Sequence, residues 1–139
     1  MLVLACASGL LATQGGKPLF FVGSSREDLL TFPDEVRRAM GYALRFAQGG
    51  TKRPAAKPLR GYGGAGVPEI IDDFMGDTYR GVYTVQFAGV VYVLPAFEKK
   101  SKHGIKTPPG DRAMVERRLK IAHEHYIDWR RQQVKGEAT

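Results

Sequence analysis

Two periods of apolar residues run along this chain and separate its strands from its helices. Short runs rich in β-branched and aromatic residues predict strands, at 18–22, 67–72, 79–87 and 90–101. Apolar residues at helical spacing predict a short helix, a longer one and a terminal one, over 24–30, from Pro33 to Gln48, and from Asp111. The three later strands follow one another closely, so we expect a sheet of at least three antiparallel strands.

The two longer helices carry apolar stripes that predict packing against the sheet. One stripe comprises Val36, Met40, Ala43, Leu44 and Ala47. The other comprises Val115, Leu119, Ala122, Tyr126 and Trp129. Thr31 and Asp111 are the expected N-caps. His123 and His125 lie two residues apart and point to different faces of the terminal helix, which excludes a chelating pair and predicts surface positions.

The stretch from Tyr79 to Ser101 is typical of a β-hairpin, because two strand-forming runs flank an alanine-glycine turn. Arg80 opens the first strand, and Lys99 and Lys100 close the second. A hairpin brings those two ends together, so a guanidinium and two ammonium groups are expected at one end of the sheet.

Two registers of this hairpin are possible. A two-residue loop places Arg80 opposite Phe97, with Lys99 on the same face. A three-residue loop that ends at a left-handed Gly89 moves the pairing by one residue and makes Lys100 the neighbour. Alanine suits the positive φ of a two-residue turn poorly, so the second register is slightly favoured. Either register gives Arg80 one lysine neighbour.

Length and composition favour one domain of 139 residues with a core of its own. The formal net charge of +7 favours a polyanionic partner through long-range attraction. Cys6 is the single cysteine and no Cys/His ligand set is present, so we expect no structural zinc and a cytoplasmic location. The acids of residues 72–77 lack the spacing of a calcium loop, and a turn with solvated carboxylates is expected there.

Residues 1–16 are interpreted as an extension of unknown role. Their apolar start is similar to the core of a signal peptide, but no basic residue precedes Lys17, and the run is too short to span a membrane. An extra strand, a partner-binding segment and an artefact of the start codon remain open. The domain itself is expected over 17–131, with a frayed tail over 132–139.

A loop over 51–66 is rich in glycine, proline and cations. Its glycines match neither GxGxxG nor a P-loop, because no strand precedes them and no GK[ST] follows, so nucleotide binding is rejected. A solvated connector and a contact loop remain equally open. A second basic loop, over 99–106, follows the hairpin.

Three motifs and the order of the elements resemble the RelE/ParE superfamily of toxins, in its phage-derived HigB-like branch. Residues 57–61 are similar to the family's Lys-Leu-x-Gly element, residues 76–83 to its Gly-x-Tyr-Arg-x-x-Tyr strand, and residues 96–101 to its Phe-x-Lys-Lys closure. The resemblance spans residues 17 to 126. It implies a small RelE-like α+β fold, with an antiparallel sheet of three to four strands, two N-terminal helices packed on it and a C-terminal helix.

The resemblance also implies a ribosome-dependent mRNA endonuclease. In the implied reaction, which uses no metal or other cofactor, a 2′-hydroxyl attacks the adjacent phosphate and leaves a 2′,3′-cyclic phosphate and a 5′-hydroxyl. The implied catalytic residues are Arg80, Lys99, Lys100, Glu69, Tyr83 and His103. The implied substrate-binding residues are Lys57, Arg60, Tyr79, Phe97, Lys102 and Lys106.

The roles within this set differ in how well the residue types fit them. Arg80 and a neighbouring lysine would neutralise the charge that grows on the phosphate. Glu69 is a candidate base, and Tyr83 or His103 would orient the substrate or move a proton. Each has a structural alternative: Glu69 as the ion-pair partner of Arg80, the tyrosines as core residues, and His103 as a solvated loop residue.

The sequence departs from this branch at Pro95 and Glu98, where relatives carry His and Gln, and at Ile71, which replaces a basic residue. The lost histidine weakens any mechanism that depends on it. The implied partners are the ribosome, mRNA and a helix-turn-helix (HigA-like) antitoxin, with no membrane partner. Two other functions remain open: a ParE-like toxin that binds DNA gyrase without nuclease activity, and a phage-derived interaction protein without toxicity.

Overall fold

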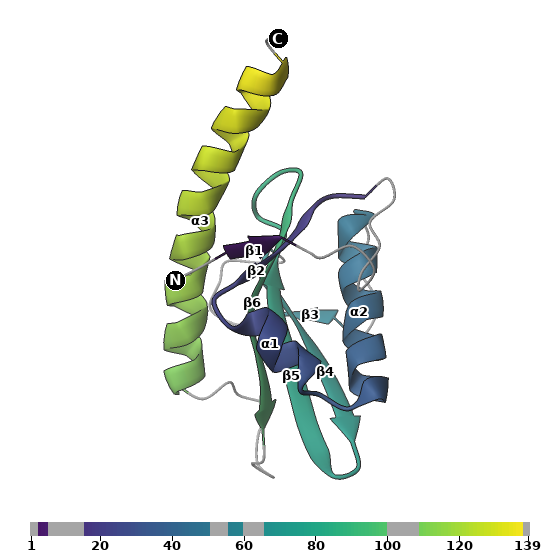
Figure 1. The fold of residues 1–139 in the computed structure, drawn as a ribbon. Helices are drawn as coiled ribbons and strands as arrows, with labels where there is room; N and C mark the ends of the chain where they lie inside the picture. Colours follow the sequence, from purple (N-terminus) through teal and green to yellow (C-terminus); the bar gives the residue numbers. More distant parts are fainter. Residues whose placement is uncertain (1–2, 6–15, 51–55, 60–65, 100–108, 138–139) are drawn as a thin grey trace.

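The structure, a computed structural model, describes residues 3–5, 16–50, 56–59, 66–99 and 109–137. Their elements, in chain order, are β1 (Val3–Ala5), β2 (Leu19–Val22), α1 (Ser25–Leu30), α2 (Asp34–Gln48), β3 (Ala56–Pro58), β4 (Pro68–Phe74), β5 (Asp77–Thr84), β6 (Val91–Lys99) and α3 (Pro109–Glu137) (Figure 1). The predicted strands and helices are confirmed, with shifts at their ends.

The described strands form one six-stranded sheet in the order β1-β2-β6-β5-β4-β3. Within it β2 and β6 pair in parallel, and the other neighbours pair antiparallel. The α+β class is confirmed, but the sheet is larger than the three to four antiparallel strands expected. The two added strands, β1 in the extension and β3 in the predicted loop, have three residues each, too few to show a period in the sequence.

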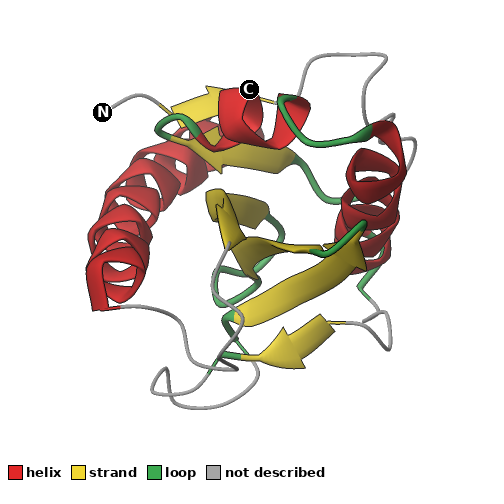
Figure 2. Cartoon of the chain, turned by 90° about the horizontal axis from the view of Figure 1, so that it is seen from below, coloured by secondary structure: helices red, strands yellow, loops and turns green. Residues whose placement is uncertain are grey.

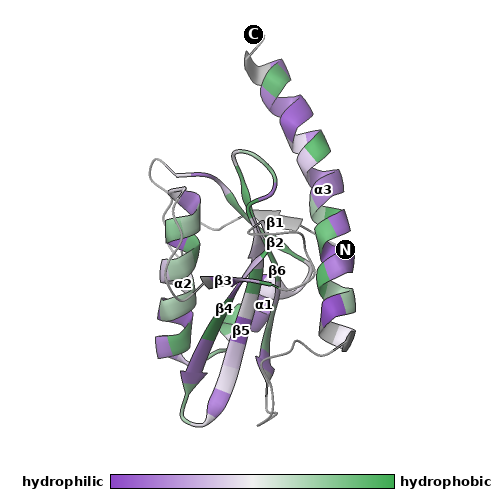
Figure 3. Ribbon diagram, turned by 180° about the vertical axis from the view of Figure 1, so that it is seen from behind, coloured by the Kyte–Doolittle hydropathy of each residue, from purple (hydrophilic) through white to green (hydrophobic). Residues whose placement is uncertain are grey.

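The helices cover both faces of the sheet, with α1 and α2 on one face and α3 on the other (Figure 1 and Figure 2). We call these the α2 face and the α3 face. Hydrophilic and hydrophobic residues alternate along α3, as expected of a helix that lays one side on a sheet (Figure 3). Both predicted stripes are confirmed, since every stripe residue of α2 is buried and those of α3 are buried or partly buried against the sheet.

Three helix ends differ from the prediction. Pro33 is the N-cap residue of α2, and no side chain caps that helix. Thr31 lies two residues before this N-cap and is the C-cap residue of α1. Its Oγ1 donates to the carbonyl of Asp28 at 2.6 Å. Asp111 lies inside the first turn of α3, and α3 continues to Glu137 through part of the tail that was expected to fray.

The β5–β6 hairpin contains both predicted registers, one on each side of a β-bulge. Near the turn, Tyr83 pairs with Val93, as a three-residue loop requires. Beyond the bulge, Arg80 pairs with Phe97, as a two-residue loop requires. The favoured register is therefore wrong at Arg80, because an extra residue in β6 shifts the pairing by one. Gly89 has the expected left-handed conformation, with φ of 86°.

Pro95 lies in this bulge, in a strand with a neighbour on both sides. Proline has no N–H, so it is tolerated where the ladder is already interrupted. Two side chains bond the carbonyls beside it: Ser25 Oγ donates to Val93 O at 3.3 Å, and Arg118 Nη1 donates to Leu94 O at 2.8 Å. Helices on both faces of the sheet thus supply hydrogen bonds to β6 where its pairing with β5 is interrupted at Pro95.

The acidic residues predicted to form a solvated turn divide between two strands. Asp72 and Asp73 belong to β4, while Asp77 begins β5. The turn between them is Met75-Gly76, and both residues have positive φ, 52° and 88°. This conformation is that of a tight two-residue hairpin turn.

Candidate functional site

The central feature of the α3 face is a buried ion pair between Glu69 on β4 and Arg80 on β5. Arg80 Nη1 lies 3.1 Å from Glu69 Oε2, and the residues are 2% and 7% exposed, respectively. The two strands pair so that Ile71 is opposite Arg80 and Val82 is opposite Glu69, which sets the two charges diagonally across the ladder. The structural alternative for Glu69, that it pairs with Arg80, is confirmed.

Three other predicted residues surround this pair. Lys57 on β3 lies directly opposite Glu69 and is exposed. Phe97 on β6 lies opposite Arg80 and is half-buried. Lys99 ends β6 opposite Thr78, and its backbone position places it two residues beyond Phe97. The sheet therefore brings Lys57, Glu69, Arg80 and Phe97 to one region of the α3 face, with Lys99 at its border.

The two predicted tyrosines lie elsewhere. Tyr79 and Tyr83 alternate with Arg80 along β5 and belong to the core of the α2 face, where the Tyr79 ring packs 4.9 Å from that of Phe32. Burial, followed by the charges of Glu98 and Asp77, raises the pKa of Tyr79. Burial alone raises the pKa of Tyr83. The structure thus separates these hydroxyls from the Glu69–Arg80 pair by the thickness of the sheet.

Five predicted residues lie outside the described part of the chain: Arg60, Lys100, Lys102, His103 and Lys106. Their roles stay predictions from the sequence.

The chemistry available at the pair follows from its burial. A carboxylate and a guanidinium are costly to bury alone, and each compensates the charge of the other in this interior. At 2% exposure, Arg80 reaches a phosphate only if neighbouring groups move apart, so in this conformation it holds Glu69 in place. Lys57 is an exposed cation in this region.

Arg118 on α3 is a buried cation that the sequence interpretation missed. It is 4% exposed, and besides the Leu94 carbonyl it donates through Nη2 to Ser24 Oγ at 3.1 Å. Burial lowers its pKa, with a smaller lowering from Arg117, while Asp28 acts in the opposite direction. The sequence does indicate that this side chain is buried, because position 118 falls on the apolar stripe between Val115 and Ala122.

His125 is a second correction, because it is half-buried and not a surface residue. Its Nδ1 lies 2.7 Å from Tyr92 Oη, and its ring meets that of Phe20 edge-on at 4.8 Å. Burial lowers the pKa of His125, although Asp128 opposes this. Burial, with a smaller contribution from Tyr126, raises the pKa of Tyr92. His123 is exposed as expected.

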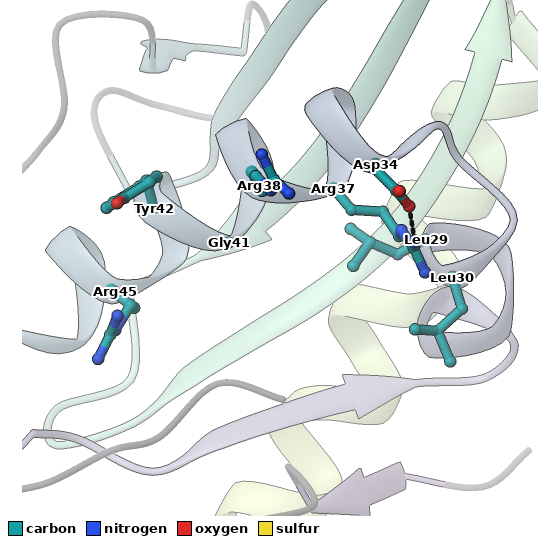
Figure 4. Close-up of a pocket in the computed structure, with 8 residues that line it drawn as sticks. All are labelled: Leu29, Leu30, Asp34, Arg37, Arg38, Gly41, Tyr42 and Arg45. Carbon is teal, nitrogen blue, oxygen red and sulfur yellow. Dashed lines mark hydrogen bonds and ion pairs between the residues drawn. The ribbon is translucent and has the colours of Figure 1, made fainter. Parts of the chain in front are cut away.

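On the opposite side of the molecule, α1 and α2 form a groove of about 510 Å³ that we call the arginine groove. Arg37, Arg38 and Arg45 line it together with Tyr42, and Leu29 and Leu30 come from α1 (Figure 4). Asp34 is its single acidic residue and is paired with Arg37. The groove is therefore cationic at its edges and apolar at the end formed by α1.

Two features of the described residues bear on other classes of function. They contain no group of three His, Cys, Asp or Glu side chains that could hold a metal ion. Among the described helices, none combines the length and the apolar character needed to cross a membrane.

Comparison with known families gives one match. The family model described as "Phage derived protein Gp49-like (DUF891)" matches residues 27–120, which include α2, the strands β3 to β6 and the start of α3. A search of curated proteins gives no match.

Proposed function

Because the chain belongs to the phage-derived Gp49-like family, a RelE/HigB-type toxin family, we propose that it is a toxin of a toxin–antitoxin pair and that it cleaves mRNA on the ribosome. Family membership is consistent with a toxin. The nuclease activity, its dependence on the ribosome and the HigB-like branch are our proposal.

The observation that carries the nuclease proposal is the grouping of Lys57, Glu69, Arg80 and Phe97 on one region of the α3 face. In the proposed reaction the 2′-hydroxyl oxygen bonds to the adjacent phosphorus, and the bond to the 5′-oxygen breaks. The hydroxyl proton goes to a base, and the leaving oxygen takes up a proton. Cations stabilise the additional negative charge on the phosphate.

The burial of the ion pair refines the roles within this proposal. Arg80 acts as a positioning residue that fixes the Glu69 carboxylate on its strand. Lys57, Lys99 and Lys100 supply the charges that meet the phosphate, and Phe97 offers a ring on which a base can stack. His103 remains the proposed proton carrier, with Arg60, Lys102 and Lys106 as further RNA contacts.

Mapping of mRNA 3′ ends after induced expression tests this function. We expect the wild-type chain to produce new 3′ ends, and Lys99→Ala/Lys100→Ala to produce about 100-fold to 1,000-fold fewer, by analogy with the loss of oxyanion-hole donors. This variant leaves the Glu69–Arg80 pair intact, which avoids the unfolding expected of Arg80→Ala. Arg130→Ala/Lys135→Ala, at exposed positions of α3, is the control and should cleave normally. Equal cleavage by the Lys99/Lys100 variant and the wild type would refute the assignment.

A ParE-like toxin that binds DNA gyrase is the second candidate, and the arginine groove favours it. The groove lies on α1 and α2, the helical hairpin that the resemblance assigns, together with the terminal helix, to gyrase binding, and on the face of the sheet opposite to Lys57. DNA breaks without mRNA cleavage after induction would support this function and exclude the first. A chain that arrests no growth, with or without the product of the neighbouring gene, would instead be the non-toxic interaction protein.

We also propose a helix-turn-helix antitoxin as the partner that neutralises this chain. Its test is co-expression with the neighbouring gene, which should restore growth and give a complex that purifies together. The proposal needs no cofactor.

A further inference from the structure

A second groove lies between α3 and the β5–β6 turn, and no role proposed above uses it. It encloses about 720 Å³. The turn contributes Phe87, while α3 contributes Arg117, Lys120 and His123, together with the acidic Glu116. We call it the α3 groove.

Three aromatic rings, those of Phe87, His123 and Tyr126, lie beside this groove, and we call them the ring cluster. The rings of Phe87 and His123 are nearly parallel, with centroids 5.4 Å apart and an interplanar angle of 6°. Tyr126 stacks on Phe87 as well, at 5.1 Å and 27°. His123 is exposed, so solvent and ligands can reach its imidazole ring.

The ring cluster is held in place before any ligand binds. Tyr126 Oη donates to the carbonyl of Ala88 at 2.9 Å, which fastens the turn to α3. Phe87 also meets the buried ring of Tyr92 edge-on, at 5.9 Å. The binding of a stacking ligand therefore loses little free energy to the ordering of these protein side chains.

Exposed cations follow the same side of the helix as His123. Arg117, Lys120 and His123 are spaced three residues apart, so each lies about 4.5 Å further along the axis. Glu116 lowers the positive potential, and it stands four residues before Lys120, where an exposed Glu–Lys pair is worth little. The lysine is thus available to an anion of higher charge.

We propose that the α3 groove binds a segment of single-stranded RNA, whose bases stack on the exposed His123 ring beside Phe87 and whose phosphates contact Arg117 and Lys120. Aromatic faces beside cations are how proteins hold single strands without reading their sequence. An acidic peptide would satisfy the cations but not the stacked rings. The choice of RNA as ligand rests on the proposed function.

The groove lies on the same face of the sheet as the Glu69–Arg80 pair. Arg80 and Val82 share the α3 face, and Phe87 packs against the core of that face. Four residues of β5 and three beyond its end separate Arg80 from Phe87, so the two lie at most about 25 Å apart along the chain. An RNA strand that enters at the α3 groove would therefore reach the proposed cleavage region several nucleotides further on.

The test is binding of a 2′-O-methyl oligoribonucleotide of about ten nucleotides that carries one 2-aminopurine. This probe has no free 2′-hydroxyl, so the proposed cleavage reaction cannot consume it and binding is measured separately from activity. We expect Arg117→Ala/Lys120→Ala to weaken binding about tenfold, and to reduce the slope of log affinity against log salt by about 1.4, or 0.7 for each lost phosphate contact. The control Arg130→Ala/Lys135→Ala removes the same charge from α3 outside the groove and should leave the slope unchanged.

Stacking has its own readout. The fluorescence of 2-aminopurine falls when it stacks, so we expect quenching with the wild-type chain and with His123→Phe, and none with His123→Ala. Equal weakening by the groove variant and the control, or equal quenching by the two His123 variants, would overturn the inference. If binding behaves as expected but no mRNA is cleaved in cells, the groove stands and the proposed nuclease function fails.

Discussion

The two faces of the sheet are built on different principles, although one set of strands supplies both. On the α2 face, none of the described buried side chains is charged: the α2 stripe, Phe21, Val91 and two tyrosines pack together, and Ser25 and Gln48 are the buried polar residues of α1 and α2. The α3 face also has an apolar cluster, but it buries charged and polar groups beside it, namely Glu69, Arg80, Thr84 and Arg118.

This difference separates stability from specificity. Apolar contacts on the α2 face stabilise the fold in proportion to their area and tolerate substitutions that keep the volume. Buried charges on the α3 face are costly unless each finds its partner, so they favour one arrangement of β4, β5, β6 and α3 over its alternatives. The proposed RNA sites lie on this second face.

The largest expected effect comes from breaking the ion pair on one side. Arg80→Met leaves the Glu69 carboxylate buried without its partner, and we expect a loss of about 3–5 kcal/mol in the free energy of unfolding. Glu69→Leu/Arg80→Met removes both charges and should recover most of that loss. Leu44→Ala on the α2 face, a control without charge, should cost about 2–5 kcal/mol through its cavity. Urea denaturation measures all three, and equal losses in the single and double variants would show that the pair is not the cause.

A smaller effect is expected at Arg118, which tests whether the bulge depends on α3. Arg118→Met removes the donors to Leu94 O and Ser24 Oγ, and a hydrogen bond from a charged group contributes about 1.5–3 kcal/mol. We expect a loss of about 2 kcal/mol in urea, with faster amide exchange around Pro95. Arg117→Met, at the exposed neighbouring position, should change stability by less than about 0.5 kcal/mol. Similar losses in both would mean that Arg118 does not support the bulge.

The smallest effect concerns pH. The folded pKa of His125 is lowered, so the unfolded chain binds a proton more readily than the folded one. Stability should therefore be full above the ordinary histidine pKa of about 6.5 and should fall as pH drops from there toward the folded pKa. We expect His125→Gln to flatten this part of the stability curve, below the ordinary histidine pKa of about 6.5. A slope that survives in His125→Gln would assign the dependence to other groups.

Local periodicity in the sequence predicts most of the helices and strands. Every residue assigned to the α2 stripe is buried, because helical spacing is fixed by the backbone alone. The α+β class and the hairpin follow from the same kind of signal. The presence of Arg80, Lys99 and Phe97 at one end of the β5–β6 hairpin was also within reach of the sequence.

What the sequence did not predict depends on contacts between distant segments. The bulge at Pro95 decides the register at Arg80, and its carbonyls are satisfied by Ser25 and Arg118, which lie far away in the chain. The separation of Tyr83 from Arg80 follows from strand alternation, but the resemblance to a family motif grouped them. The predicted surface position of His125 is wrong because the residue pattern of one helix does not reveal its hydrogen bond with Tyr92 on β6.

The parallel pairing of β2 with β6 has a consequence for folding during synthesis of the chain. Leu19 of β2 pairs with Val91 of β6. After β2 has been synthesised, about 70 more residues must therefore be made before this pairing can form. At a synthesis rate of about 5–20 residues per second, that delay is about 4–14 s, and α3 follows later still. The α3 face, with both proposed RNA sites, is therefore completed only after α3 has been made.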